Sequence, residues 1–118
     1  MCSSDLLEPV VAQELERHLA TAKEWFPHQY VPWSEGRDFE GEYDGEPWDV
    51  SQSRIDAAGR TSLVVNLLTE DNLPSYHRAI IDVTTRDSAW GEWVHRWTAE
   101  EARHSVALRD YQIGRAHV

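Results

Sequence analysis

Hydrophobic residues recur every three or four positions in three stretches of the chain, which is the period of an amphipathic α-helix. The pattern predicts helices over residues 8–26, 55–83 and 88–111. Pro9 fits the first turn of the first helix, and Pro27 is expected to end that helix. The buried stripe of the first helix is expected to comprise Leu7, Val11, Leu15, Leu19 and Ala22.

The two later helices carry stripes that advance by alternating steps of three and four residues. The inward positions of the second helix are Leu63, Leu67, Glu70, Pro74, His77 and Ile81. Those of the third helix are Trp90, Val94, Trp97, Glu101, His104, Leu108 and Tyr111. The short connection at 84–87 predicts that the two helices are antiparallel neighbours, with Ser88 or Asp87 as the cap of the third.

Pro74 interrupts the second of these stripes. Because proline lacks an N–H, Pro74 leaves the carbonyl of Glu70 without its usual helical partner. We expect a kink beside Glu70 in a helix that continues to Ile81. The alternative is that Pro74 marks a helix boundary and that the apolar residues beyond it form a separate piece.

Residues 27–54 have no helical or strand period, because prolines and glycines punctuate them and acidic residues crowd between. A structureless connection of this length is uncommon, so we expect short helical turns within it. Its aromatic residues are expected to hold the connection against the bundle; they are Trp33, Phe39, Tyr43 and Trp48.

The composition is that of a single globular domain: 118 residues, 41% hydrophobic and 27% charged. The net charge of −10 argues against non-specific binding to nucleic acid or to anionic membranes, which needs Lys and Arg. No apolar run is long enough to span a bilayer, and no secretory signal is visible. Cys2 is the only cysteine, which excludes an internal disulfide. The expected compartment is the cytoplasm.

Both ends of the sequence are compatible with DNA that is foreign to the gene. Residues 2–6 can be encoded by DNA containing GCTCTTCCGATCT, and residues 112–116 by DNA containing AGATCGGAAGAGC. These two strings are reverse complements and look like a sequencing adapter. We therefore expect residues 1–6 and 112–118 to be adapter-derived tails around a natural segment over 7–111.

Ionisable residues interrupt both later stripes at positions that face the predicted core. Glu70 lies in the second helix, and Glu101 and His104 lie in the third. A buried carboxylate needs a compensating partner, and no Lys or Arg shares these stripes. Glu-x-x-His together with a glutamate from a neighbouring helix is half of the ligand set of carboxylate-bridged di-iron bundles. Glu-x-x-His alone is a weak signal, and the inward position of Glu70 strengthens it.

The same segments resemble the soluble acyl-[acyl-carrier-protein] desaturases. Residues 69–76, Thr-Glu-Asp-Asn-Leu-Pro-Ser-Tyr, are similar to the family's Thr-Glu-Glu-x-Leu-Pro-x-Tyr segment. Residues 97–104, Trp-Thr-Ala-Glu-Glu-Ala-Arg-His, are similar to its Trp-Thr-Ala-Glu-Glu-x-Arg-His segment. Trp25, Pro27 and residues 30–32 are similar to its Trp-x-Pro-x-x-Phe-x-Pro stretch. The resemblance covers nearly all of the natural segment and indicates the N-terminal part of a bacterial-type relative.

The resemblance implies an all-α, ferritin-like helical bundle that is incomplete here, with about three of its main helices present. It implies two iron ions, with Glu70 a terminal ligand of the first iron, Glu101 a bridging ligand and His104 a ligand of the first iron. Trp25 matches a tryptophan linked to electron entry. The remaining ligands come from later helices of the family. We therefore expect the chain by itself to be inactive.

For the parent protein, the resemblance implies an O2-dependent oxidoreductase of fatty acid biosynthesis. Such an enzyme introduces a double bond into a fatty acyl chain carried by acyl-carrier protein, takes electrons from a ferredoxin-like donor and forms a homodimer. The acidic carrier needs a basic docking patch, for which Arg78, Arg86 and Arg96 are candidates. His77 matches no family ligand and is expected to be a satisfied or surface histidine. Glu100 is expected to point away from the ligands as a solvated glutamate.

Two other interpretations remain open. The first is another ferritin-like di-iron oxidase or oxygenase, which would use the same ligands on a different substrate. The second is a non-catalytic helical interaction module, in which Glu70, Glu101 and His104 are simply solvated.

Overall fold

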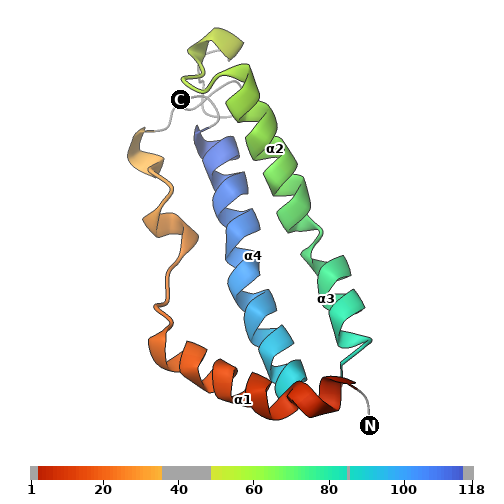
Figure 1. Cartoon of the computed structure of the whole chain (residues 1–118). Coiled ribbons are helices and arrows are strands. Elements are labelled where there is room, and N and C mark those ends of the chain that lie inside the picture. The colour runs from red at the N-terminus through yellow and green to blue at the C-terminus, as the bar shows by residue number, and fades with distance from the viewer. Residues whose placement is uncertain (1–2, 36–48, 85, 116–118) are drawn as a thin grey trace. The chain divides into compact units, whose positions relative to one another are not determined.

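A computed structural model describes residues 3–35, 49–84 and 86–115, and in this part of the chain all regular structure is helical (Figure 1). The all-α prediction is thus confirmed. The α-helices are α1 (Ser3–Thr21), α2 (Ala57–Asp71), α3 (Leu73–Ile81) and α4 (Ala89–Arg115). Three short 3-10 helices are η1 (Pro27–Gln29), η2 (Trp33–Glu35) and η3 (Val50–Gln52).

The chain forms two compact units. Unit 1 consists of Met1–Glu24 and Asn72–Ala102, and therefore holds α1, α3 and the first half of α4. Unit 2 consists of Trp25–Asp71 and Arg103–Val118, and holds α2 with the second half of α4. None of the helices in the described ranges is both long enough and apolar enough to cross a membrane.

Helix α1 begins and ends earlier than its sequence predicts. It starts at Ser3, so Pro9 lies inside the helix and not in its first turn. It ends at Thr21, whose hydroxyl donates to the carbonyl of Arg17 at 3.0 Å, and residues 22–26 are not helical. The prediction that Pro27 ends α1 was therefore wrong, since Pro27 instead opens η1. Residues 3–6, part of the predicted foreign tail, belong to this helix.

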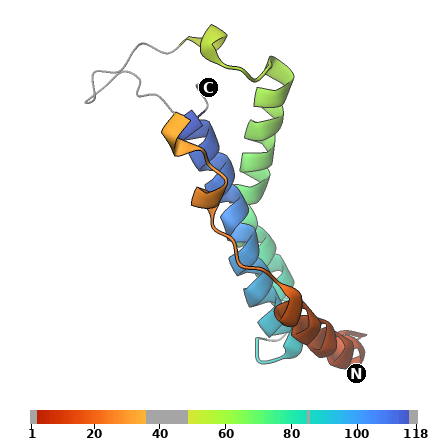
Figure 2. The same ribbon diagram turned by 90° about the vertical axis from the view of Figure 1, so that its left-hand side faces the viewer.

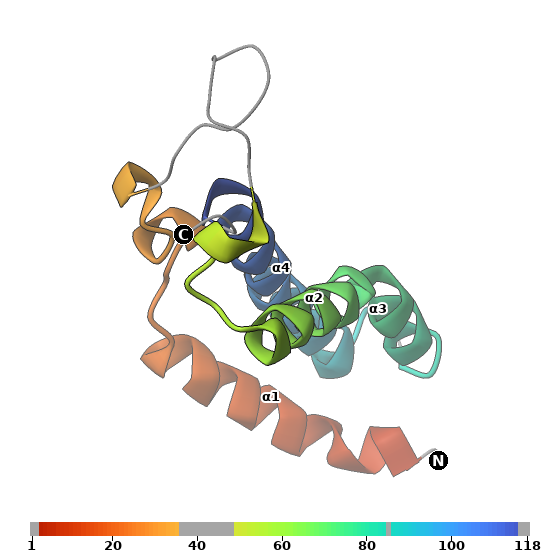
Figure 3. The ribbon, with the colours of Figure 1, turned by 90° about the horizontal axis from the view of Figure 1, so that it is seen from above.

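The predicted stripe of α1 is only partly buried. Leu15 is buried and Val11 is half-buried, whereas Leu7 and Leu19 are about half exposed. Ala22 lies beyond the end of the helix. Figure 3 shows that, within unit 1, α1 lies to one side of α4 and extends beyond it, so only part of its stripe is covered.

The predicted long second helix is two helices with a break at Asn72. Asp56 caps the start of α2, because its Oδ1 accepts the Gly59 N–H at 2.7 Å. The backbone turns at Asn72, and Pro74 occupies the second position of α3, where no N–H is needed. The kink prediction was therefore wrong, and the helix-boundary alternative is correct. Pro74 is also exposed, unlike the other members of its predicted stripe.

Helix α4 follows its predicted pattern closely. Each predicted inward position from Trp90 to Tyr111 is buried or half-buried, and Val94 is 0% exposed. The predicted cap is present, because Ser88 Oγ accepts the Gly91 N–H at 3.2 Å. In unit 1, a short connection follows α3, and the first half of α4 runs back alongside α3, as predicted (Figure 1).

Removal of the Ser88 cap should destabilise the first turn of α4. Ser88→Ala leaves the Gly91 N–H without its acceptor and should lower the free energy of unfolding by about 1 kcal/mol. Thermal unfolding followed by circular dichroism measures this loss. Ser88→Asp, which keeps an acceptor at the cap, is the matched control and should unfold close to the wild-type temperature.

The start of α1 is fastened to the start of α4. Trp90 Nε1–H donates to the Ser4 carbonyl, and the Ala89 N–H donates to Glu8 Oε1, each at 3.0 Å. The core of unit 1 lies where α1, α3 and α4 meet, and its buried residues are Leu15, Leu73, Ile81, Gly91 and Val94.

In unit 2, α2 lies beside the second half of α4, and the segment of 25–35 follows α4 on another side (Figure 2). Arg109 Nη2–H donates to both carboxylate oxygens of Asp71 at 2.7 Å, and Gln112 donates to the Leu63 carbonyl at 3.1 Å. The expected short helical turns in the connection are η1, η2 and η3. Of the aromatic residues expected to hold it, Trp33 is about half exposed and the other three lie outside the described residues.

Candidate metal centre

Glu70 and His104 meet in unit 2. Glu70 lies in the last turn of α2, and its Oε2 is 3.6 Å from His104 Nδ1 on α4. Their side chains are 29% and 43% exposed, so both are partly desolvated and still reachable. Two of the three predicted ligands, which are 34 positions apart in the chain, are therefore brought together. Their ligand atoms are close enough to bind the same ion.

Glu101, the third predicted ligand, precedes His104 by one turn of α4. Both residues belong to the same helix, α4. This proximity follows from the helix itself, because residues three apart project from neighbouring turns of one face. Glu101 is half-buried and belongs to unit 1, whereas His104 belongs to unit 2.

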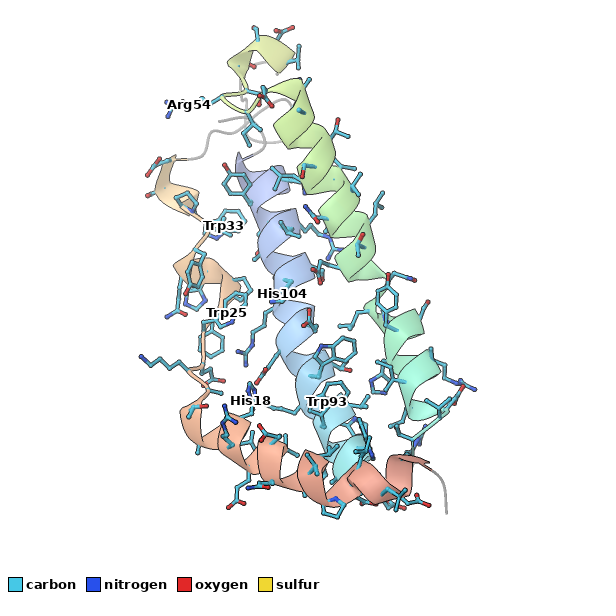
Figure 4. The ribbon with its side chains drawn as sticks, viewed as in Figure 1. His18, Trp25, Trp33, Arg54, Trp93 and His104 are labelled. Carbon is cyan, nitrogen blue, oxygen red and sulfur yellow. The ribbon has the colours of Figure 1, made fainter. Side chains whose placement is uncertain are left out.

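Trp25 packs directly on His104. The two rings are stacked with centroids 6.0 Å apart and planes 17° apart, and Figure 4 shows them pointing toward one another. Tyr30 meets the Trp25 ring edge-on at 5.4 Å. The guanidinium of Arg103 lies 5.9 Å from the Trp25 ring and 5.8 Å from that of Phe26. These contacts fix the orientation of Trp25, and through it they restrict the imidazole.

A pocket of about 310 Å³ opens in unit 2 beside these residues. It is lined by Trp25, Asn66, Glu70, His104, Ala107 and Leu108. Most of its wall is apolar, and none of these lining residues, all within the described ranges, is a lysine or arginine. Asn66 was not singled out from the sequence, although it lies one turn before Glu70 on α2. Arg103 was also missed, because only the folded chain brings it over Trp25.

The donor set fits a hard, oxygen-preferring transition-metal ion. Two carboxylates and one imidazole make a mixed set of oxygen and nitrogen donors that could hold a metal ion. The Trp25 ring stacks on His104 and restricts the orientation of its imidazole.

His77 is occupied by other contacts. Its Nδ1 lies 2.7 Å from Thr98 Oγ1, and its ring is 5.5 Å from that of His95. It is therefore a satisfied histidine, as its position outside the family motifs predicted.

Glu100 is not the solvated glutamate that the sequence predicted. His18 Nε2 lies 3.0 Å from both of its carboxylate oxygens, and Arg96 Nε–H donates to it at 2.5 Å. Partial burial opposes ionisation, but the hydrogen bonds from His18 and Arg96 outweigh it, and the pKa of the Glu100 carboxyl is lowered. Glu100 thus links α1 to α4 within unit 1.

Glu100→Gln should weaken the packing of α1 on α4 by about 1 kcal/mol, since it removes the charge from hydrogen bonds to His18 and Arg96. Because the folded-state pKa is lowered, this stabilisation is complete above the usual glutamate pKa and is lost as the pH falls below it. Urea unfolding of both proteins across the acid range measures the difference. A pH-independent gap between them would contradict this account.

The arginines proposed for docking are partly engaged within the chain. Arg78 Nε–H donates to Asp82 at 2.8 Å, and Arg96 donates to Glu100 as described above. Arg86 is exposed. The pairing of Arg78 and Arg96 with acidic residues reduces the positive charge that either can offer to an acidic partner.

The comparison with known proteins identifies the family. Residues 4–118 match the sequence model of the fatty acid desaturase family. The chain is 52% identical over 107 residues to DesA1 of Mycobacterium tuberculosis, provisionally named an acyl-[acyl-carrier-protein] desaturase. It is 40% identical over 107 residues to DesA2 of that organism, which carries the same provisional name. The chain belongs to the fatty acid desaturase family.

A solved structure supports the same relationship. The X-ray structure of DesA2 from M. tuberculosis H37Rv matches 95% of this chain with a TM-score of 0.73 and 37% sequence identity. The matches cover 91% of this chain but only 31% of DesA1 and 38% of DesA2. The chain thus spans about a third of the length of these relatives and forms a partial bundle.

Proposed function

We propose that the complete protein is an acyl-[acyl-carrier-protein] desaturase, which introduces a double bond into a carrier-bound fatty acyl chain at a di-iron centre. Family membership supports the reaction class, and the names of DesA1 and DesA2 support the acyl-carrier protein as the partner that presents the substrate. The observation that carries the proposal is the approach of Glu70 Oε2 to His104 Nδ1, at 3.6 Å.

In this proposal Glu70, Glu101 and His104 are the share of the ligands that this chain contributes. Glu70 and Glu101 would hold iron through their carboxylate oxygens, and His104 would hold it through a ring nitrogen. Bound iron would supply the activation of O2 and the two-electron oxidation of the acyl chain. The protein's own part would be to hold the imidazole of His104 with Nδ1 toward Glu70.

Trp25 has a second role in the proposal, as the point through which electrons enter. Its ring stacks on His104, and the guanidinium of Arg103 lies over the same ring. The proposed donor is a small ferredoxin-like protein. The rest of the complete chain would provide the other carboxylate and the second Glu-x-x-His, and the proposed assembly is a homodimer. One copy of the present chain should not catalyse the reaction, because it holds one side of the ligand set.

The direct test uses the complete protein with an acyl-carrier protein loaded with a saturated acyl chain, a ferredoxin reducing system and O2. We expect a mono-unsaturated product in gas chromatography with mass spectrometry, and no product without O2. A hydroxylated acyl chain would instead favour the related di-iron oxygenase. A protein that binds no iron and changes no acyl chain would favour the non-catalytic module.

A further inference from the structure

Three tryptophans of α4 form a continuous series of ring contacts in unit 1. The Trp90 and Trp93 rings meet edge-to-face with centroids 6.1 Å apart and planes 87° apart. The Trp93 and Trp97 rings are stacked, with centroids 5.9 Å apart and planes 15° apart. All three residues are half-buried. The series thus runs along two turns of the helix without a gap between rings.

The middle ring lies beside the most buried face of α4. Trp90 and Trp97 lie on the inward stripe of α4, and Val94 between them is the residue that is 0% exposed. Trp93 lies beside this stripe, where an aliphatic residue would also cover the helix. Its ring joins two tryptophans that are seven residues apart, about 10 Å along the helix axis.

The two ends of the series lie in different surroundings. Trp97 precedes Glu101 by one turn, about 6 Å along the axis of α4. At the other end, Trp90 and Trp93 line a pocket of about 250 Å³ between α1 and α4, with Val10, Val11 and Leu15 on its opposite wall. His18 and Glu14 complete the pocket, and Figure 4 labels His18 and Trp93. The series therefore connects the turn before a proposed ligand with a pocket that solvent can enter.

We propose that Trp97, Trp93 and Trp90 form an electron-transfer chain between the Glu101 end of unit 1 and the pocket between α1 and α4. Indole is among the most easily oxidised side chains, and electron transfer between aromatic rings falls steeply with distance, so contact between rings favours stepwise transfer. The physiological role rests on the proposed function, since an O2-activating centre at Glu101 would be the strong oxidant. The three tryptophans would then carry oxidising equivalents away from that centre when no substrate is bound.

Each step moves one electron toward the oxidant. Trp97 gives one electron to an oxidant beside Glu101, and Trp93 then reduces the Trp97 radical cation. Trp90 reduces Trp93 in turn, so the missing electron comes to rest on Trp90. The indole N–H of Trp90 donates to the Ser4 carbonyl, which is too weak a base to keep the proton, so oxidised Trp90 releases that proton to water. A small reductant of the thiol or ascorbate class then returns one electron and one proton to Trp90 at the pocket.

The test generates the oxidant at the position of Glu101 without any metal-centre assembly. In the full 118-residue chain, Cys2→Ser removes the only native thiol, and Glu101→Cys accepts a ruthenium polypyridyl photo-oxidant. Flash excitation with a cobalt(III) ammine as the electron acceptor produces Ru(III) beside Trp97. Transient absorption follows the tryptophan radical, and peptide mass spectrometry locates the stable oxidation products.

We expect oxidation products at Trp90, remote from the photo-oxidant. Trp93→Phe keeps a ring of similar shape that is not oxidised, so it should abolish the Trp90 products and leave those at Trp97. Trp93→Tyr restores an oxidisable ring and should recover them. Trp33→Phe, in unit 2, is the matched control and should leave the pattern unchanged. Equal oxidation of Trp90 with Trp or Phe at position 93 would overturn the proposal, as would the absence of Trp90 products in the parent chain.

Circular dichroism distinguishes a loss of electron transfer between the tryptophans from a misfolding of α4. The stacked pair should give an exciton signal in the far ultraviolet that Trp93→Phe removes, while the helical signal and the unfolding temperature stay near those of the parent chain. Because no iron is used, failure of this experiment would refute the proposed electron-transfer chain and would not affect the proposed desaturase function. Loss of iron binding in the complete protein would do the reverse.

Discussion

Glu101→Gln in the complete protein should lose most of its iron. The amide cannot carry the negative charge that a bridging ligand needs, and the change keeps the size of the side chain. Changes in residues that only support metal ligands typically cost about 10–100-fold in affinity, so loss of a ligand itself should cost at least that much. Iron per protomer, measured by mass spectrometry of the metal after buffer exchange, should fall accordingly. His104→Ala should have the same effect.

Glu100→Gln is the matched control for this experiment. It makes the same chemical change one residue earlier, but Glu100 points to His18 and Arg96. The variant should retain wild-type iron content at temperatures where it is folded, with only the small loss of stability described above. Full iron content in Glu101→Gln, or equal losses in both variants, would contradict the assignment of Glu101 as a ligand.

Val94→Asp should abolish the folding of unit 1. Val94 is 0% exposed at the centre of the packed face of α4, and an aspartate there would be a buried charge without a partner. Such a change costs about 3–5 kcal/mol, which is comparable with the whole stability of a small domain. The cooperative thermal transition seen by near-ultraviolet circular dichroism should disappear.

Val106→Asp gives the comparison on the same helix. Val106 is 40% exposed, so the new carboxylate stays hydrated and the free energy of unfolding should change by about 0.5 kcal/mol or less. A cooperative transition in Val94→Asp at the wild-type temperature would show that α4 does not pack through the predicted stripe.

The sequence predicts α4 well because its hydrophobic period is uninterrupted and begins at a clear cap. Apolar and ligand positions alternate in steps of three and four over more than twenty residues, Ser88 supplies the cap, and the whole stripe packs inward. The stripe of the second predicted helix is equally regular, but the hydrophobic period continues across the turn at Asn72. Periodicity alone therefore could not separate a kinked helix from two helices.

The end of α1 could not be read from the sequence, because long-range contact and not local preference decides it. Residues 22–26 contain helix-compatible side chains, yet Trp25 is used in a stack on His104, almost eighty positions away. The candidate ligands themselves could be predicted from the sequence, since Glu70, Glu101 and His104 are polar residues that interrupt apolar stripes. The supporting contacts of Asn66 and Arg103 could not be predicted, because they depend on the fold.

The bonds between the start of α1 and the start of α4 set a condition on synthesis by the ribosome. Ser4 and Trp90 are 86 positions apart, and Glu8 and Ala89 are 81 apart. At translation speeds of about 5–20 residues per second, α1 waits roughly 4–17 s for these partners to be made. During that interval Leu15 and Val11, which are buried and half-buried in the folded chain, have no native surface to cover them, so the nascent chain should be a client of chaperones that act on emerging polypeptides.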